Sequence, residues 1–207
     1  MKEREKTRKR IEWLCNFIWK KVCEMEDLID QTAEDGYERG FSVCMDPATD
    51  EPYTTSPCKG GECSVTLPRC PPKYMLEVGS FHTHPGGSGF SAGDLLNNIR
   101  RKSLIACLGY RLGRVNHIEC ESLSPAALDR YPKRKLEVEK LLEKAADIGD
   151  RLTHCVLSGK KDCEELWYEY EDKLKEAKAI LRRTRHTKTC RVPELFGAWE
   201  RTIEKEY

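Results

Sequence analysis

This chain lacks several features that would decide its class at once. No uninterrupted apolar run in its 207 residues approaches the length that crosses a membrane. Its formal net charge is +1, so the whole chain carries no field that attracts nucleic acid. Glu12 and Asn16 interrupt the apolar segment 11–19, and no small-residue cleavage site follows it, so we expect no signal peptide. These absences favour a cytoplasmic protein with neither a membrane nor a nucleic acid as its partner.

Cysteine, in contrast, is abundant. The chain holds eleven cysteines, four of them within residues 44–70, but those four show no Cys-x-x-Cys spacing of the kind that predicts a zinc knuckle. A reducing cytoplasm keeps most thiols free, so free structural thiols are the first interpretation. Disulfides and a second metal site stay open as alternatives. The charged fraction of 34% is also typical of hyperthermophile proteins, in which intracellular disulfides occur.

The order of the expected elements predicts an α/β (α+β) fold in its first part. An apolar seam with steps of four and three predicts one helix over residues 3–33, ended by Gly36. Residues 46–61, with three prolines and two glycines, are predicted to form a loop. A helix is expected from Ser91 to about Lys102. Strands are predicted at residues 40–45, 62–67, 74–81, 104–109 and 115–121.

From residue 124 the strand signals disappear. Two helical patterns, Val138 to Cys155 and Trp167 to Leu181, flank the turn residues 158–160 and predict a helical hairpin. A short last helix is expected over residues 192–207. We therefore predict two domains, residues 1–125 and a helical extension over residues 126–207.

The most informative segment is Phe81-His82-Thr83-His84-Pro85, at the end of the strand predicted at 74–81. Strand side chains repeat every two residues, so the two histidines lie on one face as a pair of imidazole ligands. Asp94 follows after nine intervening residues and offers a carboxylate as third ligand. Two histidines and a carboxylate leave one position open for water, as a catalytic zinc requires, so we expect one zinc ion per chain.

A zinc hydrolase also needs a proton carrier and a donor for the developing oxyanion. Ser91 stands three residues before Asp94, as in a capping box, and so places its hydroxyl on the first turn of the predicted helix. Glu38 stands just before the first predicted strand and reaches the metal-bound water if that strand lies beside the histidine strand. Glu34 and Glu62 are alternative candidates for this base.

The combination of His82-x-His84-Pro85, Ser91-x-x-Asp94 and an upstream Glu38-x-Gly40 resembles the motif of the JAMM (MPN+) metalloproteases. The resemblance covers roughly residues 10–122 and includes the order of the elements. The loop before Ser91 is one residue shorter than the family pattern, in a glycine-rich turn that tolerates a deletion.

This resemblance implies an MPN-type mixed sheet flanked by helices, to which the helical hairpin is a C-terminal extension. It implies zinc held by His82, His84 and Asp94, with Glu38 as general acid/base and Ser91 as stabiliser of the tetrahedral intermediate. It further implies a protein or peptide substrate, since relatives hydrolyse peptide or isopeptide bonds, often at the C-terminus of a ubiquitin-like protein.

Other functions are weighed against this one. Phosphoesterases of the PHP type also begin with His-x-His, but they need further His and Asp ligands, and the three other histidines of this chain show no matching pattern. The His-x-Glu and Pro-Cys-x-x-Cys signature of zinc deaminases is absent. The main alternative is a non-catalytic binding or assembly module, in which the helical hairpin binds a partner or a second copy of the chain.

Overall fold

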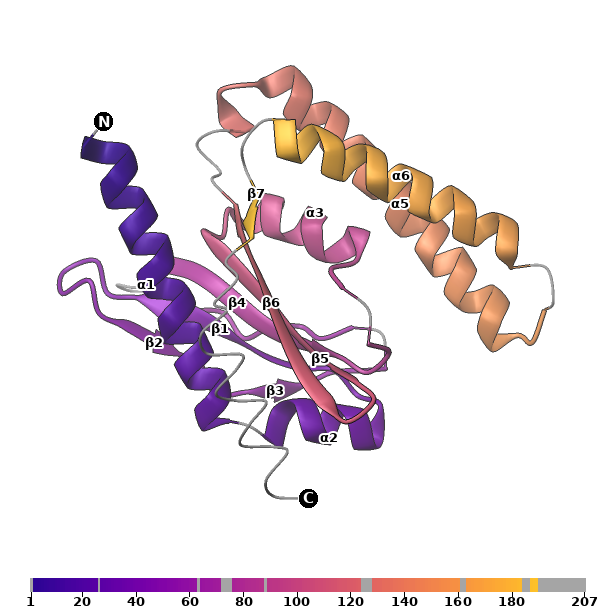
Figure 1. The fold of residues 1–207 in the computed structure, drawn as a ribbon, viewed down its shortest axis with the longest axis horizontal. Coiled ribbons are helices and arrows are strands. Elements are labelled where there is room, and N and C mark those ends of the chain that lie inside the picture. Colours follow the sequence, from indigo (N-terminus) through magenta and orange to yellow (C-terminus); the bar gives the residue numbers. More distant parts are fainter. Residues whose placement is uncertain are drawn as a thin grey trace. The chain divides into compact units, whose positions relative to one another are not determined.

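The computed structural model describes residues 2–25, 27–62, 64–71, 76–87, 89–123, 128–160, 163–183 and 187–189. Their arrangement is a mixed α/β fold that divides into two compact units (Figure 1). The first unit contains Met1–Gly89, Ser103–Ser122 and Thr189–Tyr207, and the second contains Phe90–Lys102 and Leu123–Lys188. The domain boundary predicted at residue 125 lies outside the described residues.

A mixed sheet forms the centre of the first unit. Its strands are β1 (Arg39–Met45), β2 (Pro52–Thr54), β3 (Cys58–Lys59), β4 (Leu76–His84), β5 (Ile105–Leu112) and β6 (Val115–Leu123). The strand order is β2-β1-β4-β5-β6-β7, where β7 is Thr187–Thr189, and β3 also pairs with β1. β4 and β5 run parallel, whereas β1 and β4, and β5 and β6, are antiparallel. β4 therefore lies between β1 and β5.

Two helices, α1 (Lys2–Glu24) and α2 (Asp27–Asp35), contribute to the core of this unit (Figure 1). The single helix predicted over residues 3–33 is wrong, because the chain turns at Met25, whose N–H donates to the Val22 carbonyl at 3.0 Å. Ile18 before the turn and Ile29 after it belong to the same core cluster. The apolar seam thus continues through the turn, so its period does not reveal the break. The buried members of the cluster are Leu14, Ile18, Val22, Leu28, Ile29, Phe41, Val43, Met45, Val78, Phe81, Ile105, Cys107, Ile118 and Cys120.

The predicted strands are confirmed in four cases and wrong in one. β1, β4, β5 and β6 form where the alternation predicted strands, with ends that differ by a few residues. The described residues of 62–67 form no strand, and β2 and β3 arise instead inside the segment predicted as loop. Both are short and pair with β1, and Pro52 occupies the first position of β2, where a proline is tolerated.

In the described part of the chain, six cysteines form disulfides, so the first interpretation, free structural thiols, is wrong for them. The pairs are Cys44–Cys70, Cys107–Cys120 and Cys155–Cys163. Cys58 is free. Disulfides are typical of oxidising compartments and of hyperthermophile cells, and the expected cytoplasmic location stays a prediction. In the described part of the chain, no helix has the length and apolar character needed to cross a membrane.

The second unit consists of α3 (Ala92–Arg101), α5 (Pro132–Leu157) and α6 (Glu164–Arg183). α5 and α6 contact each other along their length, which confirms the predicted hairpin, and α3 contacts α5. Leu142 of α5 is fully buried. Arg100 pairs with Glu143 at 2.5 Å, which links α3 to α5. The last helix predicted over residues 192–207 lies outside the described residues.

Candidate metal centre

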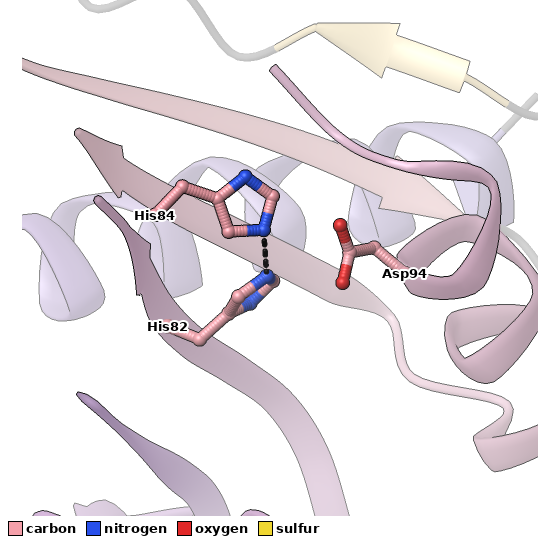
Figure 2. Close-up of side chains that lie close together, drawn as sticks. All are labelled: His82, His84 and Asp94. Carbon is pink, nitrogen blue, oxygen red and sulfur yellow. Dashed lines mark hydrogen bonds between the residues drawn. The ribbon is translucent and has the colours of Figure 1, made fainter. Parts of the chain in front are cut away.

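The two histidines of the motif end β4 on one face of the sheet. Their Nε2 atoms lie 3.2 Å apart, and the ring centroids are separated by 5.0 Å at an angle of 65° (Figure 2). His82 is 7% exposed and His84 is 8% exposed. Two nearly buried imidazoles therefore direct a nitrogen toward the same point, as the predicted His-x-His alternation requires.

Asp94 lies in the first turn of α3, where it forms the predicted capping box with Ser91. The Ser91 N–H donates to Asp94 Oδ2 at 2.8 Å, the Ser91 hydroxyl donates to the same oxygen at 2.6 Å, and the Asp94 N–H donates to Ser91 Oγ at 3.2 Å. The cap fixes the carboxylate against the helix end and also occupies the serine hydroxyl proton.

The α6 residue Tyr170 meets the same helix end, since its hydroxyl accepts a hydrogen bond from the Ala92 N–H at 3.2 Å. Burial raises the pKa of Tyr170, and the nearby Asp94 charge acts in the same direction. The first turn of α3 is therefore fixed from within its own unit by the serine cap and by a tyrosine of the hairpin.

The three predicted ligands form a group that could hold a metal ion. One ligand atom from each of His82, His84 and Asp94 lies within 4.8 Å of the others (Figure 2). Both histidines are buried, and Asp94 is partly exposed. The donor set of two imidazoles and one carboxylate suits a transition metal such as zinc better than it suits magnesium or calcium.

Of the three glutamates considered as a base, Glu38 is the one found against the histidine pair. It is 7% exposed, and its Oε1 lies 3.9 Å from His84 Nε2. Its backbone is held by two hydrogen bonds, from its N–H to the Gly61 carbonyl at 2.9 Å and from the Gly60 N–H to its carbonyl at 2.8 Å. Glu34 and Glu62 have exposed side chains.

Gly40 explains how β1 approaches the histidine strand so closely. It is paired with His82, and a Cβ at this position would lie 2.5 Å from the Phe81 carbonyl oxygen and 3.0 Å from His82 Cβ. A side chain there would push β1 away from β4. The glycine two residues after Glu38 is thus a condition for Glu38 to reach His84.

The opposite face of β4 holds this arrangement through Thr83, which is fully buried. Its Oγ1 accepts a hydrogen bond from the Arg39 N–H at 2.8 Å and lies 2.6 Å from the hydroxyl oxygen of Thr32 in α2. Behind it, the Arg39 guanidinium forms two hydrogen bonds to Asp35, at 2.9 and 2.6 Å, and Lys59 adds a third at 2.8 Å. The two cations hold the pKa of the Asp35 carboxyl well below its usual range.

Sequence reasoning missed three functional candidates on the face of the sheet that carries the histidine pair: Tyr110, His117 and Glu119. Tyr110 pairs with His84 across the parallel ladder and with His117 on β6, and the Tyr110 hydroxyl donates to Glu119 Oε1 at 2.7 Å. Burial and the Glu119 carboxylate raise the pKa of Tyr110 to about 12. Their signal in the sequence is only the alternation of the last two strands, which does not say which strand becomes the neighbour of β4.

Comparison with known proteins finds no match to this chain among family models, curated proteins or solved structures. The function must therefore be argued from the residues themselves.

Proposed function

We propose that the protein is a zinc-dependent hydrolase of amide bonds, a peptidase or isopeptidase of the JAMM type. One observation carries the proposal: two imidazole nitrogens and a carboxylate lie within 4.8 Å of one another, and a nearly buried glutamate lies 3.9 Å from one of those nitrogens. Bringing two nearly buried imidazoles and two carboxylates together costs free energy, and binding a metal ion there would offset that cost.

The spacing of the ligand atoms supports zinc. Two nitrogens that each lie about 2.0–2.1 Å from a zinc ion at the tetrahedral angle are about 3.3 Å apart. His82 Nε2 and His84 Nε2 are separated by 3.2 Å. Asp94 contributes a carboxylate oxygen as the third ligand atom of the group. Three protein ligands leave a fourth position for water.

When bound, zinc would polarise the substrate carbonyl and lower the pKa of its water. Glu38 takes the proton of the attacking water at a carboxylate oxygen as the water oxygen bonds to the amide carbon. Glu38 then delivers this proton to the nitrogen as the carbon–nitrogen bond breaks, so one water is consumed and an acid and an amine are formed. The position of Glu38 favours this role, because its nearly buried carboxylate lies 3.9 Å from His84 Nε2, next to where a metal-bound water would lie.

Ser91 has one hydroxyl proton, and Asp94 accepts it in this structure. Its first role in the proposal is to orient the Asp94 carboxylate. It stabilises a tetrahedral intermediate only if the hydroxyl proton turns from Asp94 to the substrate oxygen. A Ser91→Ala variant would therefore affect metal affinity as well as turnover.

The proposed substrate is a protein or peptide, with the C-terminal segment of a ubiquitin-like protein as the first candidate by resemblance. The second candidate function, a non-catalytic binding or assembly module, is favoured by apolar side chains that the helical hairpin exposes and that a partner or a second copy of the chain would cover. These residues are Leu136, Val156, Leu157, Trp167 and Tyr168, which are 51–74% exposed.

The test uses the full chain loaded with zinc and incubated with ubiquitin-like fusion proteins, with and without a chelator. We expect cleavage that the chelator abolishes, and a fall of about a hundredfold or more in Glu38→Gln with the zinc content unchanged. Glu34→Gln and Glu62→Gln are matched controls that should cleave normally. Failure to bind zinc after refolding would sink the enzyme proposal, and normal cleavage by Glu38→Gln would sink the choice of base.

A further inference from the structure

A second set of polar residues lies beside the histidine pair, on the opposite side from Glu38. In the sheet, β4 is flanked by β1 and by β5, and β6 lies next to β5. The register pairs His84 with Tyr110, Tyr110 with His117, and Leu108 with Glu119. Paired residues share a face, so these side chains point to the same side of the sheet as His82 and His84. β6 is two strand spacings, about 10 Å, from β4.

Tyr110 fixes the Glu119 carboxylate in place. The tyrosine is 8% exposed, and its ring stacks on the His117 ring with centroids 5.4 Å apart and planes 15° from parallel. Its hydroxyl donates to Glu119 Oε1 at 2.7 Å. A stacked, nearly buried ring therefore holds a carboxylate that is itself exposed to solvent. Exposed glutamates ordinarily sample many rotamers, and holding one in place costs side-chain entropy.

Among the described residues, no cation pairs with Glu119, whereas other carboxylates of this unit have such a partner. Asp30 pairs with Arg111, and Asp35 pairs with Arg39 and Lys59. Across the described residues, Glu119 forms no ion pair, and its second oxygen, Oε2, lies 3.4 Å from where a Cβ of Gly89 would be. Gly89 belongs to the segment that leaves His84. The carboxylate thus lies beside that segment, and no cation of the described residues compensates its charge.

We propose that Glu119, positioned by Tyr110, is a specificity-determining residue that binds a primary ammonium group of the substrate. The ammonium is either the side chain of a lysine near the scissile bond or a free N-terminal amine. The inference rests on the proposed hydrolase function, because the histidine pair defines where the substrate lies. Tyr110 is a positioning residue and does not contact the substrate.

The test measures binding without turnover, in zinc-loaded full-length Glu38→Gln. The probes are hexapeptides in pairs that differ only by lysine or norleucine at one position, each made with a free and with an acetylated N-terminus. We expect lysine, or the free N-terminus, to tighten binding about fivefold at one position. The acetylated peptides distinguish the two sources of the ammonium.

Adding Glu119→Gln should abolish this preference, because the amide still accepts the Tyr110 hydrogen bond but carries no charge. Adding Tyr110→Phe should weaken the preference about twofold, since the carboxylate loses its fixed donor. Glu51→Gln, at an exposed loop position, is the matched control and should leave the preference intact.

An ammonium preference that persists in Glu119→Gln, or the absence of any preference, overturns the inference. Cleavage by the native zinc-loaded protein is measured separately. A protein that binds lysine peptides through Glu119 but cleaves nothing contradicts the proposed hydrolase function and leaves the ammonium site standing. A protein that cleaves its substrate but shows no ammonium preference supports the proposed hydrolase function and overturns the ammonium site.

Discussion

Two regions of the molecule bring histidine and carboxylate side chains together, and they differ in how the fold holds them. At the end of β4, the two histidines are 7% and 8% exposed, and their ligand atoms converge with one of Asp94 within 4.8 Å. On α5, Asp147, Asp150 and His154 line a cavity of about 550 Å³ near the end of the hairpin. There all three side chains are exposed, and Arg151 and Lys160 line the same cavity.

The difference shows that ligand types at helical or strand spacing do not by themselves make a metal site. Helical spacing puts the α5 residues on one face, but their side chains stay in water and have cations as neighbours. The β4 pair is nearly buried in the sheet, and its nitrogens converge with a carboxylate oxygen of Asp94. Burial and convergence distinguish the two groups.

The largest expected effect separates the two regions directly. His84→Ala should reduce bound zinc from about one per chain to near zero after loading and dialysis, because only two ligands remain. His154→Ala should leave the zinc content unchanged. Metal analysis of both purified variants is the measurement, and loss of zinc in His154→Ala would mean that the α5 group is the metal site.

The next effect tests whether the region at the end of β4, unlike the α5 group, depends on close packing of β1 against β4. Gly40→Ala should lower the free energy of unfolding by about 3 kcal/mol, because its Cβ would lie 2.5 Å from a backbone oxygen that cannot move away freely. Gly61→Ala is the matched control, since the nearest atom to its Cβ is 3.8 Å away. Urea unfolding of the two variants gives the comparison, and equal midpoints would show that the strands separate at little cost.

A smaller effect tests the hydrogen bonds behind the histidines. Thr83→Val removes the acceptor of the Arg39 N–H and the partner of the Thr32 hydroxyl while keeping the side-chain volume. A buried donor without a partner costs about 2 kcal/mol, so the free energy of unfolding, measured by thermal denaturation, should fall by that amount. Thr83→Ser retains the hydroxyl and should recover most of the loss. If the serine variant is no better than valine, the packing of the methyl group is what matters.

The smallest effect is electrostatic and depends on pH. The Arg39 hydrogen bonds, followed by that of Lys59, lower the pKa of Asp35, so the folded state favours the charged carboxylate. The stabilisation is then complete above the ordinary carboxyl pKa of 3.8 and is lost as the pH falls below it. Asp35→Asn should therefore be less stable than the native protein at pH 7, with a difference that shrinks below about pH 4. A difference that is constant with pH would contradict this assignment.

The sequence identified the donor atoms of the candidate site better than it identified the scaffold. The alternation of His82 and His84 predicts their common face, and the Ser91-x-x-Asp94 spacing predicts the capping box, since both patterns depend only on local geometry. Glu38 could not be separated from Glu34 and Glu62, because the choice depends on β1 pairing with β4. That pairing is a contact between residues far apart in the sequence. Within the sequence near Glu38, Gly40 is the residue that indicates a close approach of another strand.

The scaffold was predicted less well for the same reason. The break at Met25 leaves the apolar seam intact, so the period of the sequence continues where the helix does not. β2 and β3 are short, and their existence depends on the free edge of β1 rather than on their own residues. The disulfides were left open because the paired cysteines are far apart in the sequence. Cys44 and Cys70 are separated by 26 positions and Cys107 and Cys120 by 13, so only the fold brings them together.

By itself, the sequence determined the candidate ligand groups and the helical part of the fold. These are two imidazoles on one strand face, a carboxylate on a capped helix turn, and a helical hairpin after residue 124. Those features follow from spacings of two, three and four residues, which the backbone geometry fixes locally. Only the tertiary structure decided which glutamate meets the histidines, and that Tyr110 and Glu119 share their face. Both depend on which strands become neighbours, and the packing of the whole sheet decides that.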